Sequence, residues 1–205
     1  MAKRGKFIVL DGGEGAGKST VAGTIEHSFP SEQVLVTCAG GTALGKQLKQ
    51  ILTSEEGARM TSESRFSLAW ATHADHLQSV VIPALTSGVM VVTDRFDSTA
   101  FAYQVWGEQA PNLEEIFWKT RKVFLAEYLP DLYILLDVSV ENGLQRLKKQ
   151  GRTLDYFEKR PKEFHRRVRE GYQEFFKKVP HTVVDANRPL EAVEKEVLNI
   201  IREEM

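Results

Sequence analysis

Cysteine is almost absent from this sequence. Cys38 is the single cysteine among 205 residues, which excludes an intrachain disulfide and any metal site built from several cysteines. This usage suits a reducing cytosol. His73 and His76 stand three residues apart with Asp75 between them. Because no second cluster of ligands accompanies them, a structural or solvent-facing histidine pair is favoured over a metal site.

The sequence also lacks an excess of charge and a long hydrophobic run. Its 27 Lys and Arg residues balance 28 Asp and Glu residues, for a net charge of −1, which argues against nucleic acid or a membrane surface as the main partner. The longest uncharged stretch, residues 77–93, contains Pro83 and Gly88 and is short for a membrane span. The apolar run near the N-terminus is too short for a signal peptide. We therefore expect a soluble cytoplasmic protein.

Residues Gly12 to Ser19, GGEGAGKS, match the phosphate-loop pattern G-x-x-x-x-G-K-[ST]. The match lies between an apolar run and the start of a helix at Lys18. Glycines let backbone N–H groups turn inward toward phosphate oxygens, and the helix N-terminus adds a positive dipole end. Lys18 is expected to face the surface and reach the β- and γ-phosphates, while the Ser19 hydroxyl ligates Mg²⁺. The motif predicts binding of a nucleoside triphosphate.

Apolar runs that alternate with helical patterns predict a doubly wound α/β sheet in one domain, residues 1–205. The runs are residues 7–10, 34–36, 89–93, 131–138 and 182–185. The helices are expected from residue 18, over 43–52, from 61 or 62 to 85, from 99, over 112–128, 140–150 and 164–178, and after Pro189. The expected architecture is a three-layer P-loop NTPase fold with a five-stranded parallel sheet, helices on both faces and a short mobile lid at residues 151–163. Ligands should bind at the carboxyl ends of the strands.

Several further residues fall at those expected strand ends or in the lid. Asp94 and Arg95 directly follow the third run, and the segment Gly40-Gly41-Thr42 follows the second. Paired glycines indicate either a close approach to a ligand or an ordinary turn. Two lid arginines, Arg152 and Arg160, are candidates for closing over phosphates.

Segments in nearly the whole chain resemble the bacterial thymidylate kinase family, in the family's order and spacing. They are DGGEGAGKST, GGTALGKQL, VIPAL, DRF..T..AYQ, PDLYILLDV, GLQRL, D..E with RVREGY, and VDA. The resemblance implies a homodimeric kinase of nucleotide biosynthesis that uses ATP and Mg²⁺ to convert dTMP to dTDP. Such a reaction needs in-line positioning and neutralisation of phosphate charge, without a covalent intermediate.

The resemblance also implies four sets of site residues. The ATP-binding set is Gly12, Gly13, Glu14, Gly15, Ala16, Gly17, Lys18, Ser19, Thr20, Arg146 and Asn187. The set for dTMP is Thr42, Trp70, His73, Arg95, Thr99, Ala100, Tyr103 and Gln104. The Mg²⁺ set is Ser19 and Asp94, and the catalytic set is Lys18, Arg95, Glu14 and Arg152.

Five of these residues receive a specific role from the resemblance. Glu14 would contact the acceptor region, and Arg95 would hold the acceptor phosphate. Tyr103 would crowd the 2′ position of the sugar and so favour deoxyribose. Arg146 would pack on adenine, and Asn187 would lie in the loop beside it.

The sequence departs from the family mainly around the base and sugar of the acceptor. His73 stands where an arginine usually contacts the base, Ala69 where a phenylalanine stacks on it, and Ala100 where a polar residue is common. Thr37-Cys38-Ala39 replaces a usual Arg-Glu-Pro, and Tyr156 replaces a lid arginine. Since the ATP side is intact, another or modified deoxynucleotide is the alternative acceptor.

Two alternatives of other classes are disfavoured. A non-catalytic GTPase-like switch would carry a guanine-reading Asn-Lys-x-Asp segment, which the sequence lacks. A kinase for nucleic-acid ends would use the basic region 159–169, and the near-neutral net charge argues against it.

Overall fold

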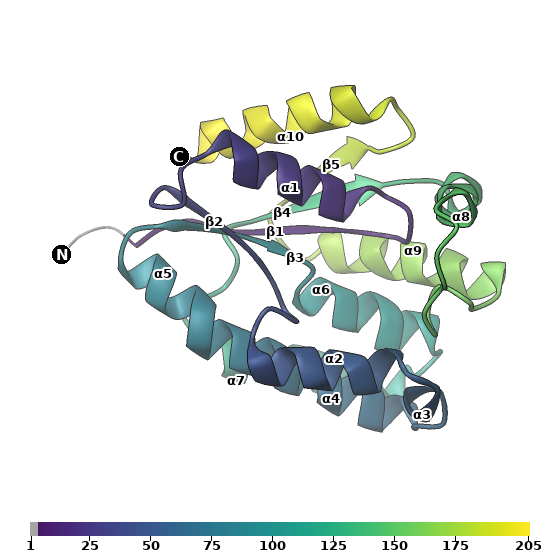
Figure 1. Ribbon diagram of the computed structural model, residues 1–205. Coiled ribbons are helices and arrows are strands. Elements are labelled where there is room, and N and C mark those ends of the chain that lie inside the picture. Colours follow the sequence, from purple (N-terminus) through teal and green to yellow (C-terminus); the bar gives the residue numbers. More distant parts are fainter. Residues whose placement is uncertain (1–3) are drawn as a thin grey trace.

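A five-stranded, all-parallel sheet lies at the centre of the computed structural model, which describes residues 4–205 (Figure 1). Its strand order is β2-β3-β1-β4-β5. The strands are β1 (Phe7–Gly12), β2 (Val34–Cys38), β3 (Met90–Asp94), β4 (Leu132–Asp137) and β5 (His181–Asp185). In register, Leu10 of β1 lies beside Asp94 of β3 and Ile134 of β4. The carboxyl ends of the strands therefore meet at one edge, where ligands bind in such sheets.

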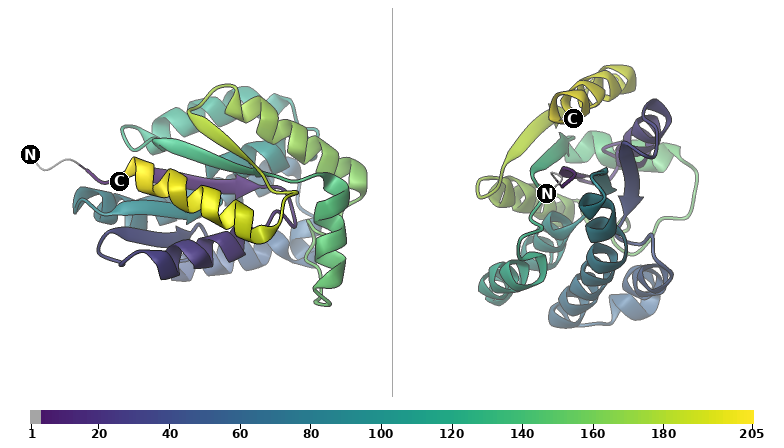
Figure 2. Two further views of the ribbon diagram at one scale, coloured as in Figure 1. Left: turned by 90° about the horizontal axis from the view of Figure 1, so that it is seen from above. Right: turned by 90° about the vertical axis from the view of Figure 1, so that its left-hand side faces the viewer.

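Helices cover both faces of this sheet (Figure 2). They are α1 (Lys18–Ser28), α2 (Ala43–Thr53), α3 (Glu55–Ala58), α4 (Ser62–His76), α5 (Ile82–Thr86), α6 (Asp97–Ala100), α7 (Asn112–Leu125), α8 (Val140–Lys149), α9 (Lys162–Phe176) and α10 (Leu190–Glu204), with two π-helical segments, η1 (Leu77–Val81) and η2 (Phe101–Gly107). Helices α1 and α10 lie on one face of the sheet, and α4, α7 and α9 lie on the other.

The alternation of side chains along β1 explains why the sheet has a core on each face. Phe7 and Val9 belong to the larger core, beneath α4, α7 and α9. Ile8 and Leu10 belong to the smaller core, beneath α1 and α10. All four are fully buried, and burial of each such side chain contributes about 1.5–3 kcal/mol. A strand that is buried on both faces has to be continuously apolar, which is the pattern that predicted it.

The predicted fold class is confirmed, while several element boundaries differ from the predictions. The helix expected from residue 61 or 62 to 85 comprises α4, η1 and α5, because Pro83 occupies the first turn of α5 and cannot donate a backbone hydrogen bond. Thr61 caps α4 as predicted, accepting from the Ser64 N–H. The helix expected over 112–128 ends at Leu125, since Ala126 has φ 46°. The short helix α3 was not predicted.

The elements that frame the carboxyl edge of the sheet come from distant parts of the sequence. Helix α2 packs on α4 below this edge, and α8 stands at its far side (Figure 1). Residues 150–161, the segment between α8 and α9, extend from α8 to α2, where the Tyr156 N–H contacts the Thr53 carbonyl. Among residues 4–205, no helix combines the length and apolar character that crossing a membrane requires.

Candidate active site

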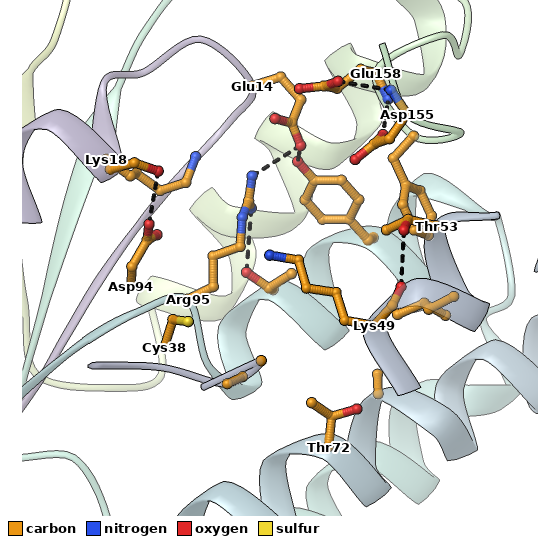
Figure 3. A pocket seen from close by; sticks show the side chains of 18 of the residues that line it. Glu14, Lys18, Cys38, Lys49, Thr53, Thr72, Asp94, Arg95, Asp155 and Glu158 are labelled. Carbon is orange, nitrogen blue, oxygen red and sulfur yellow. Dashed lines mark hydrogen bonds and ion pairs between the residues drawn. The ribbon is translucent and has the colours of Figure 1, made fainter. Parts of the chain in front are cut away.

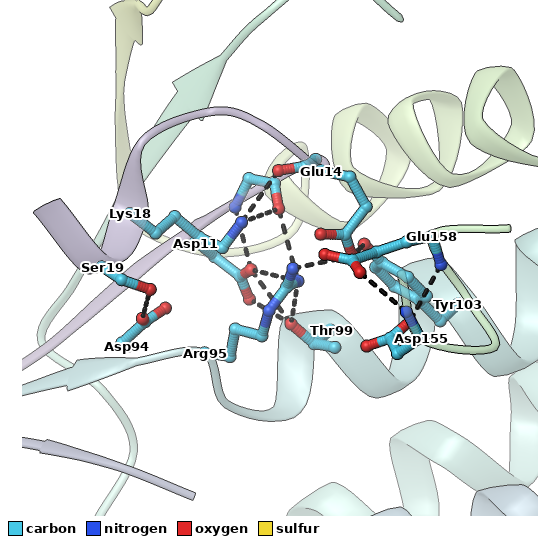
Figure 4. A network of polar contacts seen from close by, with 12 residues as sticks. Asp11, Glu14, Lys18, Ser19, Asp94, Arg95, Thr99, Tyr103, Asp155 and Glu158 are labelled. Carbon is cyan, nitrogen blue, oxygen red and sulfur yellow. Dashed lines mark hydrogen bonds and ion pairs between the residues drawn. The ribbon is translucent and has the colours of Figure 1, made fainter. Parts of the chain in front are cut away.

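The predicted phosphate loop connects β1 to α1 and closes around its own lysine (Figure 4). The Lys18 ammonium donates to the carbonyl oxygens of Gly12 at 3.0 Å and Gly13 at 2.8 Å. Lys18 is only 6% exposed, so the prediction that it faces the surface is wrong. The loop wraps over the side chain because loop carbonyls satisfy the cation. Burial lowers the Lys18 pKa, with Arg95 acting in the same direction.

Glycine is required at Gly15 by the approach of α8. Gly15 has φ +70°, and a Cβ there would lie 2.2 Å from the carbonyl oxygen of Gly143 in α8. Such a separation is far below van der Waals contact, so any side chain would push α8 away from the loop. The Arg146 guanidinium, one turn further along α8, donates to the Gly15 carbonyl at 3.3 Å. The loop is thus held from the side by α8.

Arg95 connects the phosphate loop to the end of β3. Its guanidinium donates to Glu14 Oε1 at 2.9 Å and to the Tyr172 hydroxyl at 3.2 Å. The Tyr103 hydroxyl donates to the same Glu14 oxygen, and the Tyr103 ring lies beneath the guanidinium at 5.3 Å. Arg95 has φ 67°, a left-handed conformation that is costly outside glycine and clusters at functional sites.

Glu14 is held as a carboxylate by this arrangement. Burial alone would raise its pKa, but Arg95, followed by Lys18 and Tyr103, outweighs that effect and lowers the pKa of Glu14 to about 2. A group with such a pKa is a poor base at neutral pH. In this structure the carboxylate accepts hydrogen bonds from both Arg95 and Tyr103 and so holds the two side chains together.

Ser19 and Asp94 meet across the front of the loop. The Ser19 hydroxyl donates to Asp94 Oδ2 at 3.1 Å. The other oxygen, Asp94 Oδ1, is buried and has no hydrogen-bond partner within residues 4–205. A hydroxyl and a carboxylate with a free buried oxygen are hard donors of the kind that Mg²⁺ takes, so this pair fits the ion.

One cavity of about 540 Å³ begins at the phosphate loop and ends at α4 (Figure 3). At the loop end it is lined by Glu14, Gly15 and Gly17 to Thr20, with Asp94 and Arg95 facing them. At the other end it is lined by residues of α2, α4, α6 and η2. These are Lys49, Leu52, Thr53, Ala69, Thr72, His73, Thr99, Ala100, Tyr103 and Gln104. The cavity has the size of a nucleotide-binding pocket.

His73 and Gln104 bring unpaired polar atoms to the α4 end of this cavity. His73 is 5% exposed and Gln104 is 2% exposed. Both ring nitrogens of His73 and Oε1 of Gln104 have no hydrogen-bond partner within residues 4–205. A buried unpaired polar group costs about 1–3 kcal/mol. Burial, followed by the proximity of His76, lowers the pKa of His73 to about 3, so the imidazole is neutral.

The predicted lid closes the cavity opposite α4. Arg152 and Glu158 line the cavity and form an ion pair, with Nη1 donating to Oε2 at 2.9 Å. The Tyr156 N–H reaches the Thr53 carbonyl of α2 at 3.4 Å, across the opening. The other lid arginine, Arg160, is turned away from the cavity, with its guanidinium 4.6 Å from the centre of the Phe164 ring. Of the two candidates, Arg152 is therefore the one at the site.

Comparisons with known proteins agree with this geometry. The family model described as thymidylate kinase matches residues 10–197. The chain belongs to the thymidylate kinase family. It is 39% identical over 205 residues to a thymidylate kinase of Methylobacillus flagellatus, covering 98% of each chain. It is 40% identical over 201 residues to a thymidylate kinase of Nitrosospira multiformis, covering 95% of each chain. It is 36% identical over 200 residues to a thymidylate kinase of Alkalilimnicola ehrlichii, covering 93% of this chain and 89% of the relative.

Membership of the thymidylate kinase family confirms the predicted enzyme class, and the structure places most of the predicted site residues together. Some lie outside the cavity lining. Trp70 is 2% exposed and packs in the core against Phe117. The Thr42 hydroxyl caps α2 and donates to Asp75 of α4. Asn187 accepts from the Ser139 N–H at 3.0 Å and so ties together the loops after β4 and β5.

Asp11 was not predicted as a site residue, although it holds several side chains of the site in place. It is fully buried, and its carboxylate accepts from Ser98 at 2.6 Å, Thr99 at 2.8 Å and Tyr172 at 2.6 Å. Arg95 lies 3.7 Å away. The available signal was its position, a carboxylate at the end of an apolar strand directly before the loop. Lys49 and Phe157, which also line the cavity, carried no distinguishing pattern.

Lowering the pH below 6.5 should reduce the free energy of unfolding of this protein, at pH values where most carboxylates are still ionised. Burial lowers the pKa of His73 to about 3, and burial lowers that of His76 to about 4, although Asp75 opposes the shift. Because only the unfolded chain binds these protons between pH 6.5 and pH 4, each histidine should cost about 2 kcal/mol of unfolding free energy at pH 5. Urea unfolding at pH 7 and pH 5 measures the loss.

The variant His73→Gln should lose about 2 kcal/mol less than the wild type between these two pH values. Glu14 contributes only below its unfolded value of 4.5, so it does not interfere at pH 5. Equal losses of unfolding free energy in the variant and the wild type would contradict the lowered pKa of His73.

Proposed function

We propose that this chain transfers the γ-phosphoryl group of ATP to dTMP, giving dTDP and ADP, across the cavity at the carboxyl edge of the sheet. One observation carries the proposal. Arg95 lies between the phosphate loop and the α4 end, within one cavity that contains Lys18 at one side and His73 at the other. A cation beside the phosphate loop, in a cavity that continues into a base-sized pocket, is suited to holding an acceptor phosphate against a donor phosphate.

The chain's own residues supply positioning and charge neutralisation for this transfer. Lys18 would exchange its two carbonyl partners for oxygens of the β- and γ-phosphates, and the loop N–H groups would receive the rest. Arg95 would bind the acceptor phosphate while Glu14 and Tyr172 hold its guanidinium. A phosphate monoester is largely dianionic at neutral pH, since its second pKa is about 6, so the attacking oxygen needs no base from the protein.

Ser19 and Asp94 are the residues that would hold Mg²⁺. The ion would neutralise negative charge on the phosphate oxygens of ATP. The hydrogen bond that now joins the two side chains keeps the hydroxyl and the carboxylate on the same side of the loop.

We propose that the lid completes the site through Arg152. Its pairing with Glu158 holds the guanidinium at the cavity. The pKa of Glu158 is lowered: burial opposes this, and the hydrogen bond from Arg152 is the main cause. Closure by the lid would exclude water and so suppress hydrolysis of ATP. Tyr103, with its ring packed below Arg95, would crowd the 2′ position of the acceptor sugar.

The proposed reaction is tested by ADP formation from purified protein, ATP and Mg²⁺ against a panel of ribo- and deoxynucleoside monophosphates. We expect dTMP to stimulate turnover strongly, and omission of Mg²⁺ to abolish it. Turnover of ATP that no mononucleotide stimulates would contradict the proposal and favour a nucleotide-binding switch.

The contacts of the basic region 159–169 do not favour the alternative function, a kinase that acts on the ends of nucleic acids. Lys162 pairs with Glu141, and Arg169 pairs with Asp137 at 2.7 Å. Arg167 donates to the Gly107 carbonyl at 2.9 Å. Because these three cations have intramolecular partners, they contribute less to the positive surface that a phosphate backbone requires.

A homodimer formed through α7 is the assembly that we propose from the family resemblance. Ile116, Val123 and Phe124 follow helical spacing on one side of α7 and are 48%, 72% and 41% exposed. Sedimentation equilibrium should show a dimer that Val123→Asp weakens at least tenfold, because the variant buries a charge. Val183→Asp, at a half-exposed valine of β5, is the matched control. A monomeric wild type would contradict the proposal.

A further inference from the structure

The base end of the cavity contains two groups that can each either donate or accept a hydrogen bond. Both ring nitrogens of His73 and Oε1 of Gln104 are buried without a partner in the described part of the chain. Both residues line the cavity. Unpaired polar atoms at such depth indicate a missing partner, and the cavity is the space that can supply one.

Among residues 4–205, the neighbours of His73 leave its ring nitrogens without a hydrogen-bond partner. Trp70 and Phe96 present ring faces and edges to it, with centroids at 5.9 and 5.1 Å. The Thr72 hydroxyl donates to the Leu68 carbonyl at 2.9 Å, and His76 Nε2 is paired with the Thr37 hydroxyl at 3.0 Å. No hydrogen bond within residues 4–205 therefore competes with a ligand for His73, which borders the cavity.

A neutral imidazole differs from a fixed donor such as a guanidinium. It has one N–H donor and one acceptor nitrogen, and the proton can reside on either. Burial keeps His73 in this neutral form. The Gln104 amide has the same property, because rotation exchanges its carbonyl and its NH₂ group.

Two pyrimidine classes differ in the pattern that these groups would meet. A 4-oxo pyrimidine presents an acceptor at position 4 and an N–H donor at position 3. A 4-amino pyrimidine presents the reverse, a donor at position 4 and an acceptor at position 3. A fixed donor opposite position 4 together with a fixed acceptor opposite position 3 satisfies the first pattern alone, whereas two reversible groups satisfy both.

We propose that the acceptor site of this chain takes deoxypyrimidine monophosphates with either an oxo or an amino group at position 4, and that His73 determines this breadth. The inference rests on the proposed function, since it concerns the acceptor site of the same reaction. It extends the substrate class beyond dTMP to 4-amino pyrimidine nucleotides.

The sharpest test compares dTMP with 5-methyl-dCMP. The two nucleotides share sugar, phosphate and 5-methyl group, and differ in the hydrogen-bonding pattern at positions 3 and 4. We expect the wild type to prefer dTMP by less than about 100-fold in kcat/KM, whereas a site with fixed polar groups rejects a mismatched analogue by about 10⁴-fold or more. A preference above about 100-fold would overturn the proposal.

Three variants assign the effect to His73. His73→Arg places a donor-only group at the site and should increase the preference for dTMP at least tenfold. His73→Gln retains a reversible group and should leave the preference unchanged. His27→Arg, an exposed histidine of α1, is the matched control. The ratio of kcat/KM for two nucleotides in one preparation does not depend on the folded fraction, so poor folding does not mimic the result.

The outcomes separate this inference from the proposed function. A wild type that fails to phosphorylate dTMP would contradict the function itself. A wild type that phosphorylates dTMP but rejects 5-methyl-dCMP contradicts only the wider class. If His73→Arg leaves the ratio unchanged, His73 is not the determinant.

Discussion

Replacing Lys18 with alanine is expected to lower kcat about 10³-fold or more, because it removes the cation that the loop directs at the transferring phosphate. Stability should change little. The Lys18 ammonium is bound to two carbonyls, but burial lowers its pKa, so the fold gains little from keeping it charged. One of the two carbonyls, that of Gly13, is in a partly exposed residue and can be hydrated. We expect a change in unfolding free energy of about 1 kcal/mol.

The measurement is steady-state turnover of ATP and dTMP, with thermal unfolding of the same samples. Lys119→Ala is the matched control, because Lys119 is 73% exposed and pairs with Glu115 on the surface of α7. It should retain wild-type turnover. A Lys18→Ala enzyme with more than a tenth of the wild-type kcat would refute the role given to Lys18.

Replacing Arg95 with alanine should affect both activity and stability. The variant loses the proposed contact with the acceptor phosphate, so kcat/KM for dTMP should fall about 10²- to 10³-fold. It also leaves Glu14 as a mostly buried carboxylate without its cation. We expect the free energy of unfolding to fall by about 2–3 kcal/mol at pH 7.

A second substitution separates these two effects. Glu14→Gln removes the uncompensated charge, so the double variant Arg95→Ala with Glu14→Gln should regain most of the lost stability. Its kcat/KM should remain low, because no group replaces the guanidinium. Arg202→Ala, at an exposed arginine of α10, controls for loss of an arginine. Recovery of activity together with stability would show that Arg95 acts only through the fold.

Local signals in the sequence were sufficient to predict the fold. Continuous apolar runs predicted the central strands β1, β3 and β4, since a strand buried on both faces tolerates few polar residues. The edge strands β2 and β5 are less buried and were predicted from shorter apolar runs. The phosphate loop was also predictable from the sequence. Its glycines, lysine and serine lie within eight consecutive residues, at positions that the backbone geometry of the loop requires. The exact ends of some helices were harder to predict from the sequence. The division of the long helix follows from Pro83, which the sequence shows, whereas α7 ends at Leu125 although residue 126, with φ 46°, is an alanine and not a helix-breaking residue.

The residues of the site also divide into those that the sequence predicts and those that only the tertiary structure identifies. The sequence by itself determined the parallel α/β sheet, the phosphate loop, and Asp94 and Arg95 at the edge of the sheet, because each follows from residues that are neighbours in the chain. Only the tertiary structure decided that Asp11 organises the site, that Arg152 and not Arg160 lies at the cavity, and that Lys18 is buried. It also decided that His73 is buried and that its ring nitrogens have no hydrogen-bond partner within residues 4–205. These properties arise from burial and from contacts between segments up to 161 residues apart, such as Asp11 and Tyr172, and no local pattern encodes them.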